Sequence, residues 1–116
     1  MAISPPTAQR FSTESIRLAA LAKALAHPAR IEILMMLSKQ NSCVCGDIVE
    51  TLPLAQSTVS QHLSELKSAG LIKGTIDGPK VCYCLDAVGI AEARDLLGET
   101  LGVLSERCTK TDTSCC

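Results

Sequence analysis

Aromatic residues are almost absent from this sequence. Phe11 and Tyr83 are its only aromatic side chains, and tryptophan does not occur. Proteins that bind single-stranded nucleic acid stack the bases on aromatic rings, so this scarcity argues against that kind of binding. The hydrophobic fraction of 47% still provides a core of aliphatic side chains, which suits small packed helices.

Long apolar runs are also missing. No stretch of the chain approaches the roughly 20 apolar residues that a membrane-spanning helix needs. The opening residues, MAISPPTAQR, lack a charged segment followed by an apolar one, so we expect no secretion signal. These absences predict a cytoplasmic protein with no membrane partner.

The sequence also lacks the usual patterns of catalysis. It contains no CxxC motif, no glycine-rich phosphate loop, no paired carboxylates and no arrangement of cysteine with histidine. We therefore expect neither enzymatic activity nor an organic cofactor.

A strong net charge is absent as well, since the formal value is −1. The charges are unevenly distributed, however. The charged side chains of residues 1–40 are mostly basic, whereas those of residues 86–107 are mostly acidic. One face of the molecule can therefore still meet the phosphates of DNA.

The spacing of apolar residues predicts a mainly α-helical domain with a small β-hairpin. Ser12 caps a helix that runs to about Ala26, and Pro28 opens a second helix that we expect to be buried on most sides. Residues 39–46 form a polar turn. The remaining predicted elements are a short helix at 47–52, a helix at 56–68, a hairpin across 71–85 and a last helix at about 86–107.

This order of elements is typical of a winged helix–turn–helix. We expect a flexible arm at 1–11, one DNA-binding and dimerisation domain at 12–107, and a cysteine-rich tail at 108–116. The first and last helices are too apolar to be left exposed, so they predict a homodimer.

The helix at 56–68 is the expected DNA-reading helix. Its inward stripe is Val59, Leu63 and Leu66, and its outward side carries hydrogen-bonding side chains near the helix start. Lysines on this helix and on the hairpin add contacts to phosphate. The predicted DNA-binding residues are Gln56, Ser57, Thr58, Ser60, Gln61, His62, Lys67, Lys73 and Lys80.

Two stretches resemble the ArsR/SmtB family of metal-responsive repressors: LAKALAHPARIEILMML and CVCGDIVETLPLAQSTVSQHLSELKSAGLIKG. The likeness covers about residues 16–100. It implies a dimeric winged helix–turn–helix that blocks transcription when free and leaves operator DNA when its effector binds. By this likeness, residues 56–62 contact DNA and the first and last helices pair the protomers.

Seven cysteines fall into three groups. Cys82 and Cys84 alternate on a strand, so both face the same side, and we interpret them as small apolar side chains packed under the wing. Cys43 and Cys45 resemble the CVC pattern through which family members hold arsenite, cadmium or lead. They lack a third thiol nearby, because Ile48 and Val49 follow and the N-terminal arm has no cysteine.

The tail carries the third group, Cys108, Cys115 and Cys116. Three thiols at short chain separation match As(III) or Sb(III), which favour three thiolates. We therefore expect trivalent arsenic or antimony as the inducer, bound by the tail, with Cys43 and Cys45 as the alternative site. A repressor switched by thiol redox or reactive sulfur, and a Cd or Pb sensor, remain alternatives. The last helix lacks histidines, which argues against a zinc sensor of the family's usual kind.

Overall fold

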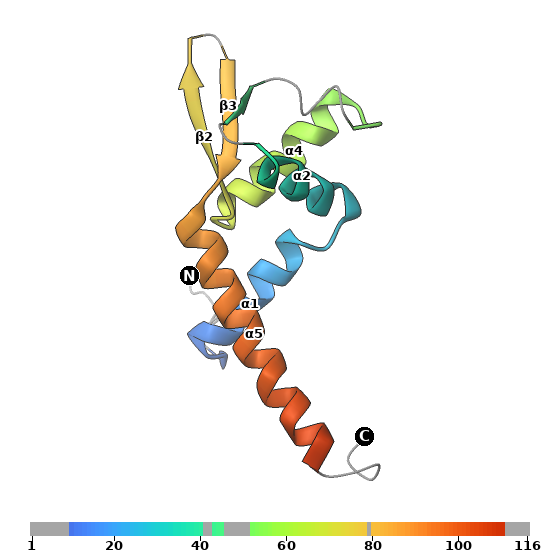
Figure 1. The fold of residues 1–116 in the computed structure, drawn as a ribbon, viewed down its shortest axis with the longest axis vertical. Coiled ribbons are helices and arrows are strands. Elements are labelled where there is room, and N and C mark those ends of the chain that lie inside the picture. Colours follow the sequence, from blue (N-terminus) through green and yellow to red (C-terminus); the bar gives the residue numbers. More distant parts are fainter. Residues whose placement is uncertain (1–9, 41–42, 46–51, 79, 111–116) are drawn as a thin grey trace, which may run out of the picture.

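The computed structural model describes residues 10–40, 43–45, 52–78 and 80–110. It is mainly helical, with one small antiparallel sheet, as the sequence predicts (Figure 1). The elements are α1 (Thr13–Ala24), α2 (Pro28–Ser38), β1 (Val44–Cys45), α4 (Gln56–Ser68), β2 (Ile72–Asp77), β3 (Lys80–Leu85) and α5 (Ala87–Lys110).

Local capping sets the starts of the first two helices. The Ser12 hydroxyl accepts a hydrogen bond of 3.0 Å from the backbone N–H of Ser15, which satisfies a free amide in the first turn of α1. His27 caps α2 in the same way, its Nδ1 accepting from the Ala29 N–H at 3.0 Å. Pro28 occupies the first turn, where a missing N–H costs nothing. Both predicted helix starts are confirmed.

The sheet has the strand order β1-β3-β2. Strands β2 and β3 form the predicted hairpin, and Gly78 at its turn has a φ of +64°, a conformation that glycine adopts without strain. Strand β1 was not expected. Residues 44–45 pair antiparallel with β3 instead of lying in a polar turn. The prediction of a turn across 39–46 is therefore wrong for these two residues.

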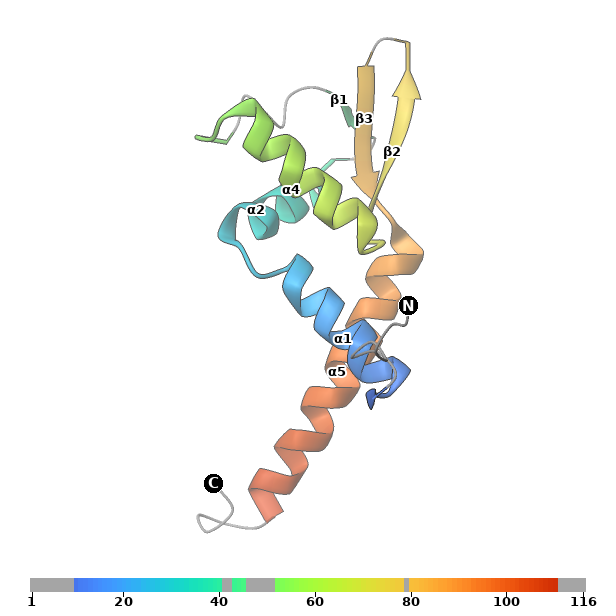
Figure 2. The same cartoon turned by 180° about the vertical axis from the view of Figure 1, so that it is seen from behind.

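The core lies where α1, α2, α4 and the base of the sheet meet. Its most deeply buried side chains are all aliphatic: Leu21, Ile33, Val59, Leu66, Leu71 and Ile72. Helix α2 contributes Ile33 and Leu37 to this core but leaves Ile31 and Met35 exposed, so it is less buried than predicted. Figure 2 shows α4 crossing over α2, with the hairpin to one side.

Helix α5 starts at the base of the wing, passes α1 and continues well beyond it (Figure 1). Its 24 residues correspond to a length of roughly 36 Å. It ends at Lys110 rather than at the expected Arg107, which places Cys108 on the helix instead of in the tail. Within the described ranges, no helix is long and apolar enough to cross a membrane.

Several predictions fall on residues outside those ranges. The arm lies almost wholly within residues 1–9, the short helix at 47–52 lies almost wholly within 46–51, and Cys115 and Cys116 lie within 111–116. These predictions stay predictions.

Candidate functional site

The exposed face of α4 begins at its first residue. Gln56, Ser57, Thr58, Ser60 and Gln61 are all exposed. The opposite face is the predicted apolar stripe, which is buried. The structure thus places five of the predicted DNA-reading side chains together in the first half of one helix.

The N-terminus of α4 also suits an anionic partner. Its N-cap residue, Ala55, provides no side-chain cap, and the first turn carries no acidic residue. The amide groups of that turn and the positive end of the helix dipole are therefore not neutralised by the helix itself. A phosphate group would be favoured there.

His62 is not on the outward face, so that part of the prediction is wrong. The side chain is only 7% exposed, and its Nδ1 accepts a hydrogen bond of 3.0 Å from Arg30 Nε. The ring of His27 lies 4.4 Å away, centroid to centroid. Position 62 follows Val59 by three residues and precedes Leu66 by four, which puts it on the buried stripe.

This environment lowers the pKa of His62. Burial is the main cause, and electrostatic interactions with His27 and Arg30 act in the same direction. Among the described residues, the buried Nε2 of His62 has no hydrogen-bond partner. Arg30 also donates to the carbonyl of Lys23 at 3.1 Å, so it joins the end of α1 to α2 and α4. His62 therefore takes part in the helix packing that supports the exposed face of α4.

The predicted phosphate-contacting lysines are more scattered. Lys67 lies in the last turn of α4 and Lys73 lies on β2, and both are exposed. Lys80 opens β3, but its side chain is outside the described part of the structure.

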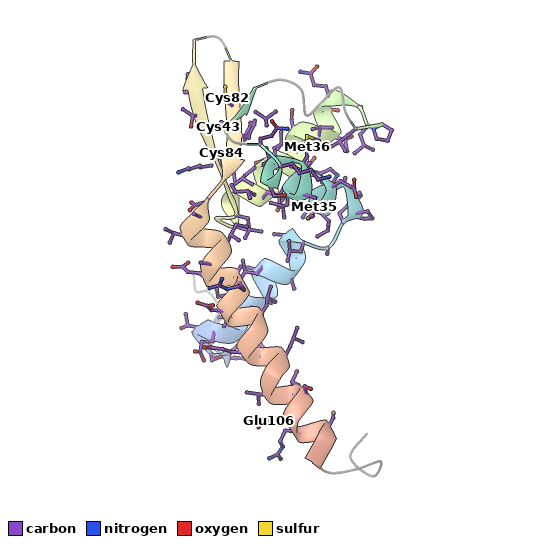
Figure 3. All side chains as sticks on the ribbon, viewed as in Figure 1. Met35, Met36, Cys43, Cys82, Cys84 and Glu106 are labelled. Carbon is purple, nitrogen blue, oxygen red and sulfur yellow. The ribbon has the colours of Figure 1, made fainter. Side chains whose placement is uncertain are left out.

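The structure brings two cysteine groups together that the sequence analysis kept apart. Cys43 immediately precedes β1, Cys84 lies on β3, and their thiols are hydrogen-bonded to each other. This contact raises the pKa of the Cys84 thiol, and burial raises it further. Figure 3 shows Cys43 beside β3, close to Cys82 and Cys84. Cys84 is therefore a thiol near Cys43 that the neighbouring sequence does not supply.

The second pair follows from the strand register. The Cα of Cys45 is the pairing partner of the Cα of Cys82. Cys82 is 4% exposed and is disulfide-bonded. Both CxC segments thus meet where β1 pairs with β3. The sequence gives a weak signal for this, because equal spacing on two strands permits two opposite pairs in an antiparallel sheet.

A pocket of about 330 Å³ opens beside these residues, lined by Cys43, Lys73, Cys84 and Leu85 with the end of α2. Lys73 is the register partner of Cys84 on β2, so it places a cation next to the thiols. Cys108 is exposed and belongs to the last turns of α5. That end of α5 lies far from the hairpin (Figure 1). Among the described residues, no three potential ligands form a group that could hold a metal ion.

Comparisons with known proteins assign this architecture. Residues 27–73 match the model of the "Bacterial regulatory protein, arsR family". The transcriptional regulator CmtR of Mycobacterium tuberculosis is 40% identical over 87 residues, which cover 75% of this chain and 70% of CmtR. The chain belongs to the ArsR family.

Solved structures of other transcriptional regulators have the same fold. The crystal structure of Rv0081 from M. tuberculosis has a TM-score of 0.62 and 33% identity, covering 84% of this chain and 98% of that one. A "possible transcriptional regulator for arsenical resistance" has a TM-score of 0.60 and 29% identity, covering 74% and 93%. This ArsR-family protein is accordingly a DNA-binding regulator of transcription with a winged helix–turn–helix fold. Its relatives are regulators rather than enzymes.

Proposed function

We propose that this ArsR-family regulator is a cytoplasmic, homodimeric repressor that leaves its operator when trivalent arsenic or antimony binds its cysteine thiolates. One observation carries the DNA-binding part: hydrogen-bonding side chains are exposed along the first half of α4, directly opposite its buried stripe. Glutamine pairs with adenine in the major groove, and serine and threonine hydroxyls bond phosphates or bases. Gln56 and Gln61 are the proposed base readers.

The apolar surface of α5 supports the dimer. Leu101, Val103 and Leu104 are each more than half exposed, at 62%, 62% and 56%. They lie in the second half of α5, where Val103 lines a pocket together with residues at the start of α1. A second copy of the chain that covers this surface would place two α4 helices for two half-sites about one turn of DNA apart.

Cysteine content and placement support the thiophilic effector. The proposed ligands are Cys108, Cys115 and Cys116, since three thiolates suit the soft trivalent metalloids, and Cys43 with Cys45 is the alternative. Cys108 lies near the end of α5, so binding of a metalloid by Cys108, Cys115 and Cys116 would act on the proposed dimer helix. A coupling of about 1–3 kcal/mol is enough to lower operator affinity 5- to 150-fold.

An operator-binding titration tests the proposal. Full-length protein is held under a phosphine reductant with a duplex selected from random DNA for tight binding, and As(III), Sb(III), Cd(II) and Zn(II) are added in turn. We expect As(III) or Sb(III) to release the DNA. The Cys115→Ser/Cys116→Ser variant should bind DNA normally and not respond, whereas a response lost only in Cys43→Ser assigns the sensor to the alternative pair.

One observation favours a second candidate, a repressor switched by thiol oxidation. Cys82 is disulfide-bonded, which supports a switch that depends on cysteine oxidation in the wing. In the same titration, release by hydrogen peroxide or polysulfide that the reductant reverses, with no release by metalloid under reductant, would select this candidate.

A further inference from the structure

The thiols of Cys43 and Cys84 have no role in the proposed tail site. We propose that these two cysteines form a reversible dithiol–disulfide pair, which exchanges with low-molecular-weight disulfides that carry carboxylates. The closed form would join the segment that precedes α4 to the base of the wing. The proposal deepens the second candidate function, the repressor switched by thiol oxidation, and rests on it for its regulatory role.

The backbone holds the two cysteines opposite each other. The Cα atoms of Cys45 and Cys82 are paired across β1 and β3. Two residues further along the same antiparallel register, Cys43 lies opposite Cys84. Directly opposite Cα atoms in antiparallel strands are about 4.5 or 5.5 Å apart, and disulfides span Cα separations of about 4.4–6.8 Å. The backbone separation of such a pair therefore suits a disulfide.

Contact between the thiols agrees with this placement. The side chains of Cys43 and Cys84 are hydrogen-bonded to each other, and both cysteines lie beside β3 or on it (Figure 3). Neither is in a disulfide, whereas Cys82 on the same strand is. Two thiols in hydrogen-bonding contact need only a short movement to become bonded sulfurs. A small reactant that oxidises one of them therefore finds the other within reach.

A pocket gives small molecules access to the pair. Both cysteines line it, and both are partly exposed. Its volume of about 330 Å³ lies at the lower end of the range for ligand pockets, roughly 300–1,000 Å³. This size suits one arm of a small disulfide, with the second arm in solvent.

The charge at the pocket favours an acidic reactant. Lys73 is the register partner of Cys84 on β2, and it is the charged side chain among the described residues that line the pocket. Asp86 also interacts electrostatically with Cys84. Its carboxylate lies outside the lining and accepts a hydrogen bond of 3.2 Å from the Gly89 N–H at the start of α5. A carboxylate on the reactant is therefore attracted by the nearby ammonium group.

The reaction is thiol–disulfide exchange. The thiolate of one cysteine attacks a sulfur of the reactant, forms a mixed disulfide with it and expels a small thiolate, which takes up the proton that the cysteine lost. The other cysteine, as thiolate, then attacks the protein sulfur of the mixed disulfide, and the second small thiolate leaves and takes up that proton. Two electrons pass from the protein dithiol to the reactant, which becomes two small thiols. An excess of small thiol reverses both steps.

Equilibration with glutathione tests the pair. The full-length variant Cys45→Ser/Cys82→Ser keeps Cys43 and Cys84 at the sheet, together with the cysteines near the C-terminus. It is reduced with a phosphine, freed of reductant without air, and placed in buffers of increasing ratio of oxidised to reduced glutathione. Remaining thiols are alkylated, and linked tryptic peptides are identified by mass.

We expect the peptides that carry Cys43 and Cys84 to become linked as the ratio rises and to separate in excess reduced glutathione. Adding Cys84→Ser should replace the link by a persistent glutathione adduct on Cys43, because no second thiol displaces the glutathione. Peptides that stay unlinked at every ratio, or links formed only with the C-terminal cysteines, would overturn the proposal.

Wild-type protein provides a test that does not depend on the folding of variants. Chymotrypsin cuts after Tyr83, so it separates Cys82 from Cys84. Fragmentation of the linked peptides then distinguishes a bond to Cys43 from a bond to Cys45. A link between Cys84 and Cys43 supports the pair, and Cys84 that is recovered unlinked or bonded elsewhere at every ratio overturns it.

The class of reactant is tested by its charge. Initial rates of linking are compared for oxidised glutathione, which carries carboxylates, and cystamine, a disulfide with ammonium groups. Lys73→Gln should lower the ratio of the first rate to the second by about threefold, as loss of an exposed charge contact does. The control is Lys67→Gln, an exposed lysine of α4 outside the pocket lining, which should leave the ratio unchanged.

An equal ratio of rates in Lys73→Gln and wild type would overturn the acidic class of reactant. The linking experiments contain no DNA, and operator release by As(III) or by oxidants is measured separately. Failure of the cysteine pair is therefore distinguishable from failure of either proposed switch.

Discussion

Gly89 lies directly against the carbonyl group of Gly70, so closely that a Cβ atom on Gly89 would be 1.7 Å from the Gly70 oxygen. This contact joins the start of α5 to the turn that follows α4. Gly70 itself has a φ of +82°, as expected for the residue that ends a helix in this way. The Asp86 N–H donates to the Leu71 carbonyl at 3.0 Å in the same place. The proposed dimer helix and the DNA-reading helix are thus fixed to each other at one point.

Replacing Gly89 with alanine should destabilise the protein. The added methyl group meets backbone on the facing turn, which cannot move aside as a flexible side chain would, and overpacking of this kind costs about 1–3 kcal/mol. The matched control is Gly98→Ala in the same helix, where an added Cβ meets nothing within 4 Å. That change should stabilise by roughly 0.5–1 kcal/mol, since alanine is the better helix former. Urea unfolding measures both, and equal stability of the two variants would contradict the contact.

Replacing Gln61 with alanine should weaken specific operator binding by about 1–3 kcal/mol, the value of a good contact to a base. The control is Ser68→Ala, at the far end of α4 and also exposed. Fluorescence anisotropy on selected and scrambled duplexes separates specific from non-specific affinity. If the Gln61→Ala variant binds the selected duplex as tightly as wild type does, this face of α4 does not contact the bases.

His62 should make stability depend on pH. Its pKa is lowered in the folded state, so the unfolded chain binds the proton more readily. Stability is then fully present above the ordinary value of 6.5 and is lost as the pH falls below it. We expect His62→Asn, which keeps an acceptor for Arg30, to reduce this loss. Urea midpoints at several pH values between neutral and mildly acid check the slope, and parallel curves for the two proteins would refute the role of His62.

The exposed end of α5 should control assembly. Leu101→Glu/Leu104→Glu places charges in the proposed interface, and we expect a dimer in wild type and a monomer in the variant by analytical ultracentrifugation. Val88→Glu is the control, because Val88 is exposed near the other end of α5. A wild-type protein that sediments as a monomer while it binds DNA specifically would rule out this interface.

Local sequence signals were sufficient for most helices and for the hairpin. Helix α4 has the bounds that its apolar period predicted, because Pro53 precedes it and Gly70 ends it. His62 was predicted on the outward face because its side chain is polar. Its spacing from Val59 and Leu66 nevertheless puts it on the buried face.

Strand β1 could not be found in the same way. It has two residues, Val44 and Cys45, and its partners on β3 are far along the chain. So short a strand has no period of its own, and it exists because β3 offers an unpaired edge. The contact of Cys43 with Cys84 depends on that long-range pairing, so it was missed along with the strand.

The cysteines of β1 and β3 also delimit a segment of the chain. Helix α4 and strand β2 lie wholly between Cys43 and Cys84, whereas α1, α2 and α5 lie outside. A disulfide across the two strands would close a loop of roughly 40 residues and remove on the order of 4 kcal/mol of chain entropy from the unfolded state. Local opening of α4 and β2 would become rarer once this loop is closed, and their amide hydrogens would exchange more slowly than those of α5. The rigidity of the DNA-reading part of the molecule would then depend on the chemical state of its own cysteines.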